Sequence, residues 1–208
     1  MSSTLRVLCL HGFRGSGAGL EPQMRPLIAG LEPELELVHV DAPARARGGP
    51  GWWNAVSIAG VDPSVKHYEG WDETRAWVRQ LFAGSAPFDG VFGFSQGAAL
   101  AALLVGMRAT NNVDALERPL AFSFAVLVGG FVSNDPAHAA LYQASECFDL
   151  PSFHLIGRAD RIVPREASLA LAARFVHPTV FEHDGGHVIA STAEARREFA
   201  NFLRARRS

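Results

Sequence analysis

The sequence predicts an α/β fold with a mostly parallel, doubly wound sheet, and two observations support this fold class. Short apolar segments of strand length alternate with segments of helical periodicity along nearly the whole chain. In the middle of the chain, a strand leads through the motif Gly93-Phe94-Ser95-Gln96-Gly97 directly into an alanine-rich helix. Such alternation places helices on both faces of a sheet, because each crossover between parallel strands packs onto one face.

Apolar runs in the first half of the chain predict strands at residues 5–10, 34–41 and 88–94. Apolar residues at helical spacing predict helices within residues 20–31 and over residues 71–82 and 96–107. Pro22 and Pro26 leave the start of the first helix open, since proline is favourable only in a first turn. Asp72 is the expected N-cap of the second helix.

The second half of the chain continues the same alternation. Strands are predicted at residues 122–128, 150–157 and 179–183, and helices at residues 165–175 and 191–204. Pro164 is favourable at the first turn of the helix that follows it. Ser191 and Glu194 have the spacing of a capping box at the start of the last helix.

Residues 42–70 form the longest stretch without a regular pattern. They are rich in proline and glycine and carry the aromatic residues Trp52, Trp53 and Tyr68. A loop longer than about 15 residues in a compact domain is usually functional. Two roles stay open for its aromatic side chains, which either fill a gap in the core or line a substrate entrance.

Composition bounds the class of protein. The 208 residues are 48% hydrophobic with a net charge of -2, which predicts one domain over residues 1–208 with one well-buried core. Nucleic-acid binding is not expected, because the chain has no lysine- or arginine-rich face.

The same survey predicts a cytoplasmic protein. No signal peptide is recognisable, and the apolar run at residues 5–10 is too short for a membrane span of ~20 residues. Cys9 lies in a predicted buried strand, so a disulfide with Cys147 is not expected and a reducing compartment is favoured.

The central motif has the pattern of a nucleophile elbow. In this turn a serine is held in a strained backbone conformation that exposes its hydroxyl at the carboxyl edge of a sheet. Gly93 and Gly97 are required where any Cβ would collide with the neighbouring strand and helix. Ser95 is therefore the candidate nucleophile.

Two further residues complete a candidate catalytic triad. Ser95, Asp160 and His187 each follow the carboxyl end of a predicted strand, and these ends meet at one crevice of a parallel sheet. Their order along the chain is the one that the α/β-hydrolase fold uses. An imidazole can take the serine proton, and a carboxylate fixes the imidazole tautomer and stabilises the imidazolium.

Other residues of the same types fit less well. His183 lies within or at the end of a strand, whereas His187 lies in the loop beyond it. Asp149 precedes its strand and so falls at the wrong edge of the sheet, and Asp184 is too close in sequence to His187 to reach it easily. His11, at a strand end, is expected to order its loop by hydrogen bonding.

The glycine-rich residues 11–19 follow the first strand. They lack the glycine spacing of a dinucleotide site and the Gly-Lys-Ser/Thr of a phosphate loop. A loop after an early strand supplies one oxyanion-hole N–H in serine hydrolases, and the residue after the nucleophile supplies the other. The predicted donors are the backbone N–H groups of Phe13 and Gln96.

The predicted substrate-binding residues are apolar. No sequence segment is long enough for a cap domain between the elbow helix and the last strand, so the loops themselves must hold substrate. The candidates are Trp52, Trp53, Phe131, Val163 and Val188. Arg14, Arg158 and Arg161 are expected to face solvent or pair with carboxylates.

Several of these segments together resemble the FSH family of small serine hydrolases. The resemblance is carried by Leu10-His11-Gly12-Phe13, Trp52-Trp53, residues 93–98, residues 157–164 and Gly185-Gly186-His187. That family includes carboxylesterases and thioesterases that release fungal polyketides, so the resemblance implies hydrolysis of an acyl ester or thioester by Ser95, Asp160 and His187. The chain is also similar to the acyl-protein thioesterases and carboxylesterases, but residues 14–17 depart from their pattern.

The sequence thus predicts a serine esterase or thioesterase that acts through an acyl-enzyme on small-molecule substrates with medium-chain, apolar acyl groups, without a metal or cofactor. Two alternatives from other classes remain. One is a non-catalytic protein that keeps the fold and binds a small ligand in the crevice, and the other is a peptidase.

Overall fold

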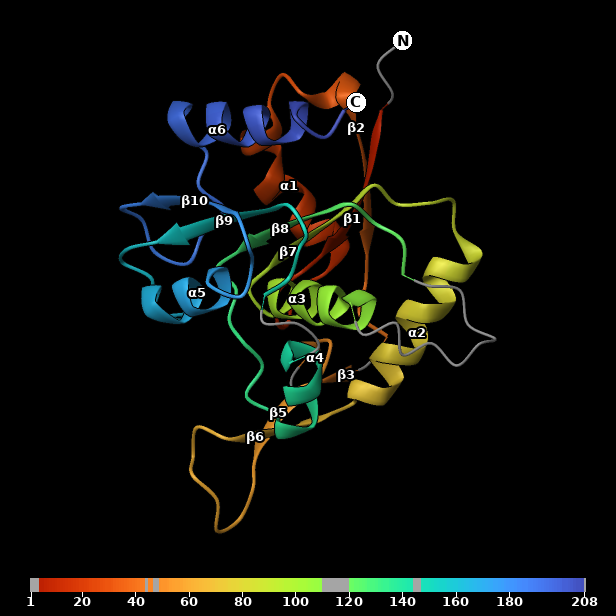
Figure 1. Cartoon of the computed structure of the whole chain (residues 1–208), viewed down its shortest axis with the longest axis vertical. Helices are drawn as coiled ribbons and strands as arrows, with labels where there is room; N and C mark the ends of the chain where they lie inside the picture. Colours follow the sequence, from red (N-terminus) through yellow and green to blue (C-terminus); the bar gives the residue numbers. More distant parts are fainter. Residues whose placement is uncertain (1–3, 44, 47–48, 110–119, 144–146, 208) are drawn as a thin grey trace.

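A six-stranded parallel sheet runs through the centre of the computed structural model, which describes residues 4–43, 45–46, 49–109, 120–143 and 147–207 (Figure 1). The strands lie in the order β10, β9, β8, β7, β1, β2, and every neighbouring pair is parallel. Their bounds are Leu5–Leu10 (β1), Leu35–Val40 (β2), Gly90–Phe94 (β7), Phe124–Val128 (β8), Ser152–Gly157 (β9) and Pro178–His183 (β10). Each predicted strand is present, with its ends shifted by up to two residues.

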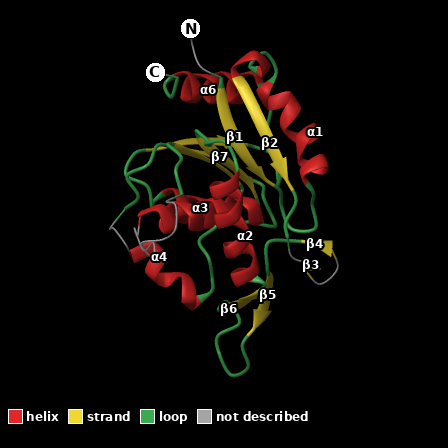
Figure 2. Ribbon diagram, turned by 90° about the vertical axis from the view of Figure 1, so that its right-hand side faces the viewer, coloured by secondary structure: helices red, strands yellow, loops and turns green. Residues whose placement is uncertain are grey.

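Helices cover both faces of the sheet, as Figures 1 and 2 show. Helices α1 (Gly17–Ile28) and α6 (Ala193–Arg204) lie on one face, and α2 (Trp71–Gly84), α3 (Gln96–Ala109) and α5 (Arg165–Ala172) lie on the other. The short elements are η1 (Glu32–Glu34), η2 (Pro136–His138) and α4 (Ala139–Gln143). Two buried apolar clusters, one on each face, form the core. Among the described helices, none has the length and hydropathy to cross a membrane.

The strand order creates a crevice between β1 and β7. The chain runs from β1 outward to β2, then returns to the other side of β1 and continues from β7 to β10. At such a switch point the connections leave the carboxyl ends of two neighbouring strands in opposite directions, which opens a ligand site. The predicted nucleophile follows β7 and the predicted oxyanion loop follows β1, so both lie at this point.

Helix α1 begins three residues earlier than the sequence indicates. Ser16 is its N-cap, and the Ser16 hydroxyl accepts a hydrogen bond of 3.0 Å from the Gly19 N–H. Pro22 and Pro26 both lie inside the helix. They are tolerated because both are exposed, so the carbonyls that lose their intrahelical partner face water.

Two helix caps differ from those predicted. Gly70, in the left-handed region with φ 88°, is the N-cap of α2, and Asp72 lies in the first turn, where its charge complements the helix dipole. The capping box of Ser191 and Glu194 is absent, because Thr192 is the N-cap of α6 and accepts a hydrogen bond from the Ala195 N–H. The true cap lies one residue later, and the box position is then an alanine.

The stretch 42–70 is less irregular than predicted. It contains β3 (Arg45–Ala46) paired with β4 (Gly49–Pro50) and β5 (Asn54–Ser57) paired with β6 (Lys66–Glu69), both antiparallel. Residues 44 and 47–48 lie outside the described part. The β5–β6 hairpin extends away from the sheet in Figures 1 and 2. Strands of four residues give too short an alternation to predict from the sequence.

Buried histidines make the fold sensitive to acid. Burial lowers the pKa of His11, His138, His154 and His183, in the case of His154 to about 3. The unfolded chain takes up protons on these imidazoles below their ordinary pKa of about 6.5, whereas the folded chain resists protonation. The contribution of these histidines to stability is therefore fully present above that pH. It decreases as the pH falls toward their lowered pKa values.

We expect the free energy of unfolding, measured with denaturant, to decrease from about pH 7 to about pH 5. The matched variant His154→Leu removes one of the titrating groups. Its decrease should be smaller by up to about 1.4 kcal/mol per pH unit, whatever its stability at pH 7. An identical pH slope in the variant and the parent would show that His154 is not held neutral in the folded chain.

Candidate active site

Ser95 occupies a strained turn between β7 and α3. Its φ of 57° lies in the left-handed region, which non-glycine residues rarely adopt. The Ser95 N–H donates to the carbonyl of Val128 on β8 at 2.8 Å. A Cβ on Gly97 would lie 2.1 Å from the Leu10 carbonyl oxygen, and a Cβ on Gly93 would lie 2.2 Å from the Gly97 carbonyl oxygen. Only glycine at these two positions lets β7, α3 and β1 approach this closely.

Asp160 and His187 form a buried pair at the carboxyl ends of β9 and β10. His187 Nδ1 lies 2.5 Å from Asp160 Oδ2, and the other oxygen, Oδ1, accepts the N–H groups of Ile162 and Val163 at 2.8 and 2.9 Å. Burial acts to raise the pKa of Asp160, but these hydrogen bonds outweigh it and hold that pKa below its ordinary value. The carboxylate is thus ionised, which fixes the proton of His187 on Nδ1.

The other ring nitrogen of His187 is available for chemistry. The imidazole lies against Phe94, the residue before the nucleophile, with 4.8 Å between ring centroids. Its Nε2 atom is buried and has no hydrogen-bond partner among the described residues. With Nδ1 protonated by the contact to Asp160, Nε2 carries the lone pair that a general base needs.

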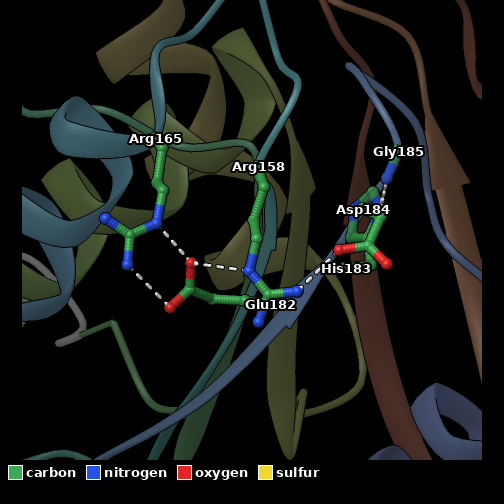
Figure 3. A network of polar contacts seen from close by, with 6 residues as sticks. All are labelled: Arg158, Arg165, Glu182, His183, Asp184 and Gly185. Atoms are coloured by element: carbon green, nitrogen blue, oxygen red, sulfur yellow. Dashed lines mark hydrogen bonds and ion pairs between the residues drawn. The ribbon is translucent and has the colours of Figure 1, made fainter.

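A polar network joins the loops that carry the acid and the base, as Figure 3 shows. Arg165 donates to both carboxylate oxygens of Glu182, and Arg158 donates to Asp184 at 2.8 Å. Backbone bonds from Arg158 to His183 and from Ala159 to Gly185 tie the same loops together. Exposed ion pairs contribute little to the free energy of unfolding. We therefore infer that these pairs act by holding the two loops in a fixed geometry.

The Arg158 contacts agree with the expectation that this residue pairs with carboxylates. The rivals of the triad residues are also accounted for. The His183 side chain accepts the Gly185 N–H through Nδ1 at 3.1 Å, and Asp184 is almost fully exposed. Within the described part of the chain, no cluster of three or more His, Cys, Asp or Glu side chains has the arrangement of a metal site.

The loop after β1 lies directly beside the nucleophile. A Cβ on Gly12 would lie 3.3 Å from the Ser95 Cβ. His11 orders the loop, because its Nδ1 contacts the Gly12 carbonyl at 2.7 Å and its Nε2 accepts the Ala42 N–H at 3.0 Å. The backbone N–H groups of Phe13 and Gln96 make no hydrogen bond to another described residue. Both are free to bind an oxyanion.

Trp52 is a core residue, which corrects its prediction as a substrate contact. Its exposed fraction is 0%, and its indole N–H donates to the His11 carbonyl at 2.7 Å. The Gln96 side chain accepts the Trp52 N–H at 3.0 Å and donates to the Trp53 carbonyl at 2.8 Å. Trp52 and Gln96 therefore bind the oxyanion loop, the elbow helix and the 42–70 segment into one unit. No sequence pattern indicates this hydrogen bonding.

An open cavity of about 540 Å³ adjoins the nucleophile. Ser95, Gln96 and Phe13 line one part of it, and the predicted residues Trp53, Phe131 and Val163 line its wall. Val188 is 52% exposed and is not among the lining residues, so the structure does not support its predicted contact with substrate. The loop 42–70 thus serves both roles left open, since Trp52 and Trp53 are both buried in the core and Trp53, although only 1% exposed, also lines the cavity.

The remaining lining residues were missed by sequence reasoning. They are Asn54, Ala55, Val56, Lys66, Tyr68, Asn134 and Ile162. Most lie on the β5–β6 hairpin, whose strands of four residues are too short to give a sequence signal. An adjoining cavity of about 420 Å³ shares Phe131, Asn134, Ile162 and Val163 and extends along α5 to Ala167 and Ala170. The two cavities form one groove with a largely apolar wall.

Comparison with known proteins places this chain in a family. Residues 1–199 match the family described as "Serine hydrolase (FSH1)". The chain belongs to the FSH1 family of serine hydrolases. The predicted resemblance is confirmed, and the FSH1 match spans the nucleophile elbow, the Asp160–His187 pair and both sides of the groove.

Relatives agree with the FSH1 assignment, and a solved structure shows the same fold. Esterase OVCA2 from Mus musculus is 34% identical, with 96% of each chain covered. Esterase CG5412 from Drosophila melanogaster is 32% identical over 99% of this chain and 76% of its own length. Zea mays acyl-protein thioesterase 2 superposes with a TM-score of 0.69 at 20% identity, covering 100% of this chain and 96% of that one. The predicted α/β-hydrolase fold is confirmed, and the described residues form no separate cap domain.

Proposed function

We propose that this FSH1 serine hydrolase cleaves carboxylic esters or thioesters of medium-chain, apolar acyl groups through an acyl-enzyme. One observation carries the proposal. Ser95 lies in a strained elbow next to Phe94, whose ring lies against His187 of the Asp160–His187 pair, and it opens onto a groove with an apolar wall. The relatives named as esterases support the type of bond cleaved.

The residues suggest a defined course for the reaction. His187 Nε2 takes the Ser95 proton as Oγ attacks the acyl carbon, and Asp160 stabilises the imidazolium that forms. The N–H groups of Phe13 and Gln96 stabilise the oxyanion. Proton transfer from His187 to the departing alcohol or thiol leaves the acyl group on Ser95, and a water activated by the same imidazole releases it.

The shape of the groove supports an extended acyl chain. Phe131, Ile162 and Val163 belong to both adjoining cavities, so a chain attached at Ser95 can pass over them toward α5. Ile162 is 72% exposed and Phe13 is 43% exposed, and both rim the groove. Covering such side chains with substrate is favourable, because it removes apolar surface from water.

We expect kcat/KM for aryl esters to rise at least tenfold from acetyl to octanoyl, because each methylene that enters the groove contributes up to about 0.8 kcal/mol. The variant Phe131→Ala should flatten this rise while leaving acetyl ester hydrolysis within a few-fold of the parent. Steady-state rates over acyl groups of graded length, as esters and as thioesters, provide the measurement.

The matched control is Val180→Ala on β10, where a valine is exposed outside the groove, and its chain-length profile should equal that of the parent. Equal activity on acetyl and octanoyl esters would place acyl binding elsewhere. Peptides assayed beside the esters test the other enzymatic alternative, since faster peptide cleavage would favour a peptidase.

A further inference from the structure

Lys66 is the only lysine in the chain, and it lines the same cavity as Ser95. It lies on β6, where side chains alternate between the two faces of the ribbon. Tyr68, two residues further on, lines the cavity as well, so the face of β6 that carries Lys66 is the face turned toward substrate. A positive charge is therefore built into a wall that is otherwise apolar or neutral.

The backbone of Lys66 is anchored, and its ammonium group has one hydrogen-bond partner. The Lys66 backbone N–H donates to the Asn134 carbonyl at 3.0 Å, and Nζ donates to the hydroxyl of its cross-strand partner Ser57 at 2.9 Å. The strand itself is anchored to the body, because the Tyr68 N–H donates to Asp135 at 2.7 Å. The charge thus has a defined place at the hairpin end of the cavity.

No carboxylate among the described residues pairs with Lys66. The acidic groups nearby have other partners. Asp62 accepts both the N–H and the hydroxyl of Ser64, and Asp135 accepts the N–H groups of Tyr68 and Ala137. A cation on a cavity wall that lacks a protein counter-charge can be neutralised by an anionic group of the ligand.

The hairpin register gives the separation between the charge and the nucleophile. The Trp53 carbonyl is bound to Gln96, next to Ser95, and β5 then runs to Ser57, which pairs with Lys66. An extended strand rises about 3.3 Å per residue, so these four residues span roughly 13 Å. That distance corresponds to a chain of roughly eight to ten atoms.

We propose that the groove accepts substrates with an anionic group, a carboxylate or a phosphate, roughly eight to ten atoms from the scissile carbonyl, with Lys66 as its binding partner. The inference rests on the proposed ester or thioester hydrolysis. Val56 and Phe131 line the stretch of the cavity between Ser95 and Lys66, where they contact the apolar part of the chain. In chemical terms the anion can belong to the acyl chain or to the leaving group, and the experiment separates the two.

The experiment compares matched pairs of esters of equal length. One series carries a terminal carboxylate, or its neutral methyl ester, on the acyl chain, and a second series carries a carboxylate or phosphate on the alcohol. We expect the parent to favour the anionic member of one series by about tenfold in kcat/KM. The series in which the preference occurs identifies the side that carries the charge.

Three variants test whether Lys66 is the cause. Lys66→Met keeps the length of the side chain and should abolish the preference by lowering kcat/KM for the anionic esters toward the value for their neutral partners. Lys66→Arg should restore most of it. Arg196→Met removes one exposed charge from α6, far from the hairpin, and should keep the full preference.

The outcomes separate this inference from the proposed function. Hydrolysis of neutral esters with no preference for either anionic series, or a preference that persists in Lys66→Met, would overturn the role of Lys66 alone. A parent protein that hydrolyses neither neutral nor anionic esters would instead overturn the proposed hydrolysis, and with it the inference.

Discussion

Replacing Ser95 by alanine is expected to lower the turnover of a simple aryl ester by several orders of magnitude and to leave the fold intact. The reaction loses its nucleophile, and His187 and the oxyanion donors supply only a small residual rate. The fold is retained because alanine also carries a Cβ at the same positive φ and keeps the backbone bond to Val128. Steady-state kinetics with circular dichroism and thermal unfolding check both parts.

A fluorophosphonate probe tests the same residue by a second route. Elsewhere the structure holds a serine–histidine hydrogen bond, in which Ser133 Oγ lies 2.7 Å from His138 Nδ1. That pair is not supported as a catalytic site, since the nearby Asp135 carboxylate accepts backbone N–H groups instead. We expect the probe to label Ser95 and to leave Ser133 unmodified.

Ordinary turnover by Ser95→Ala would exclude this nucleophile. A folded parent protein that neither reacts with the probe nor hydrolyses esters would favour the alternative of a non-catalytic binding protein. Labelling at Ser133 in place of Ser95 would move the nucleophile to the segment before η2.

Much of the fold could be predicted because its signals are local. The six strands of the sheet are apolar runs, and the elbow motif marks where β7 meets α3. The errors occur where a tertiary contact decides the outcome. Pro22 and Pro26 fit inside α1 because both face solvent. Thr192 rather than Ser191 caps α6, because the Thr192 side chain is the one that accepts the Ala195 N–H.

The site residues also separate into those that could be predicted from the sequence and those that could not. Residues at strand ends could be placed from the order of the chain, because a parallel sheet brings these ends together. The residues that line the pocket could not be placed from the sequence, because a tryptophan that only fills the core and one that also lines a cavity look the same in sequence. Trp52 and Trp53 are adjacent in sequence and both are buried in the core, yet only Trp53 lines the cavity, while Trp52 is bound to the His11 carbonyl. Lys66 enters the site only through a hairpin whose strands have four residues each.

Asp160→Asn is expected to lower kcat by roughly three to four orders of magnitude, the size of effect seen when a triad aspartate becomes asparagine in a serine protease. The orientation of the new amide follows from the structure. Asp160 Oδ1 accepts the N–H groups of Ile162 and Val163, so the amide oxygen must take that place. The amide NH₂ group then faces His187 Nδ1, which can accept its hydrogen bond only by giving up its own proton. The proton moves to Nε2, and His187 can no longer accept one from Ser95.

Asp184→Asn provides the matched control for this variant. Asp184 lies on the same loop as His187 and pairs with Arg158, but its side chain is almost fully exposed and does not contact the imidazole in the described structure. Its kcat should stay within a few-fold of the parent, since an exposed ion pair contributes little. Equal losses in kcat in the two variants would mean that the loss follows from removing a negative charge near the site and not from the tautomer of His187. Near-parental turnover in Asp160→Asn would exclude Asp160 from the triad. If Asp160 held the His187 tautomer, the variant would carry the tautomer that cannot serve as a base.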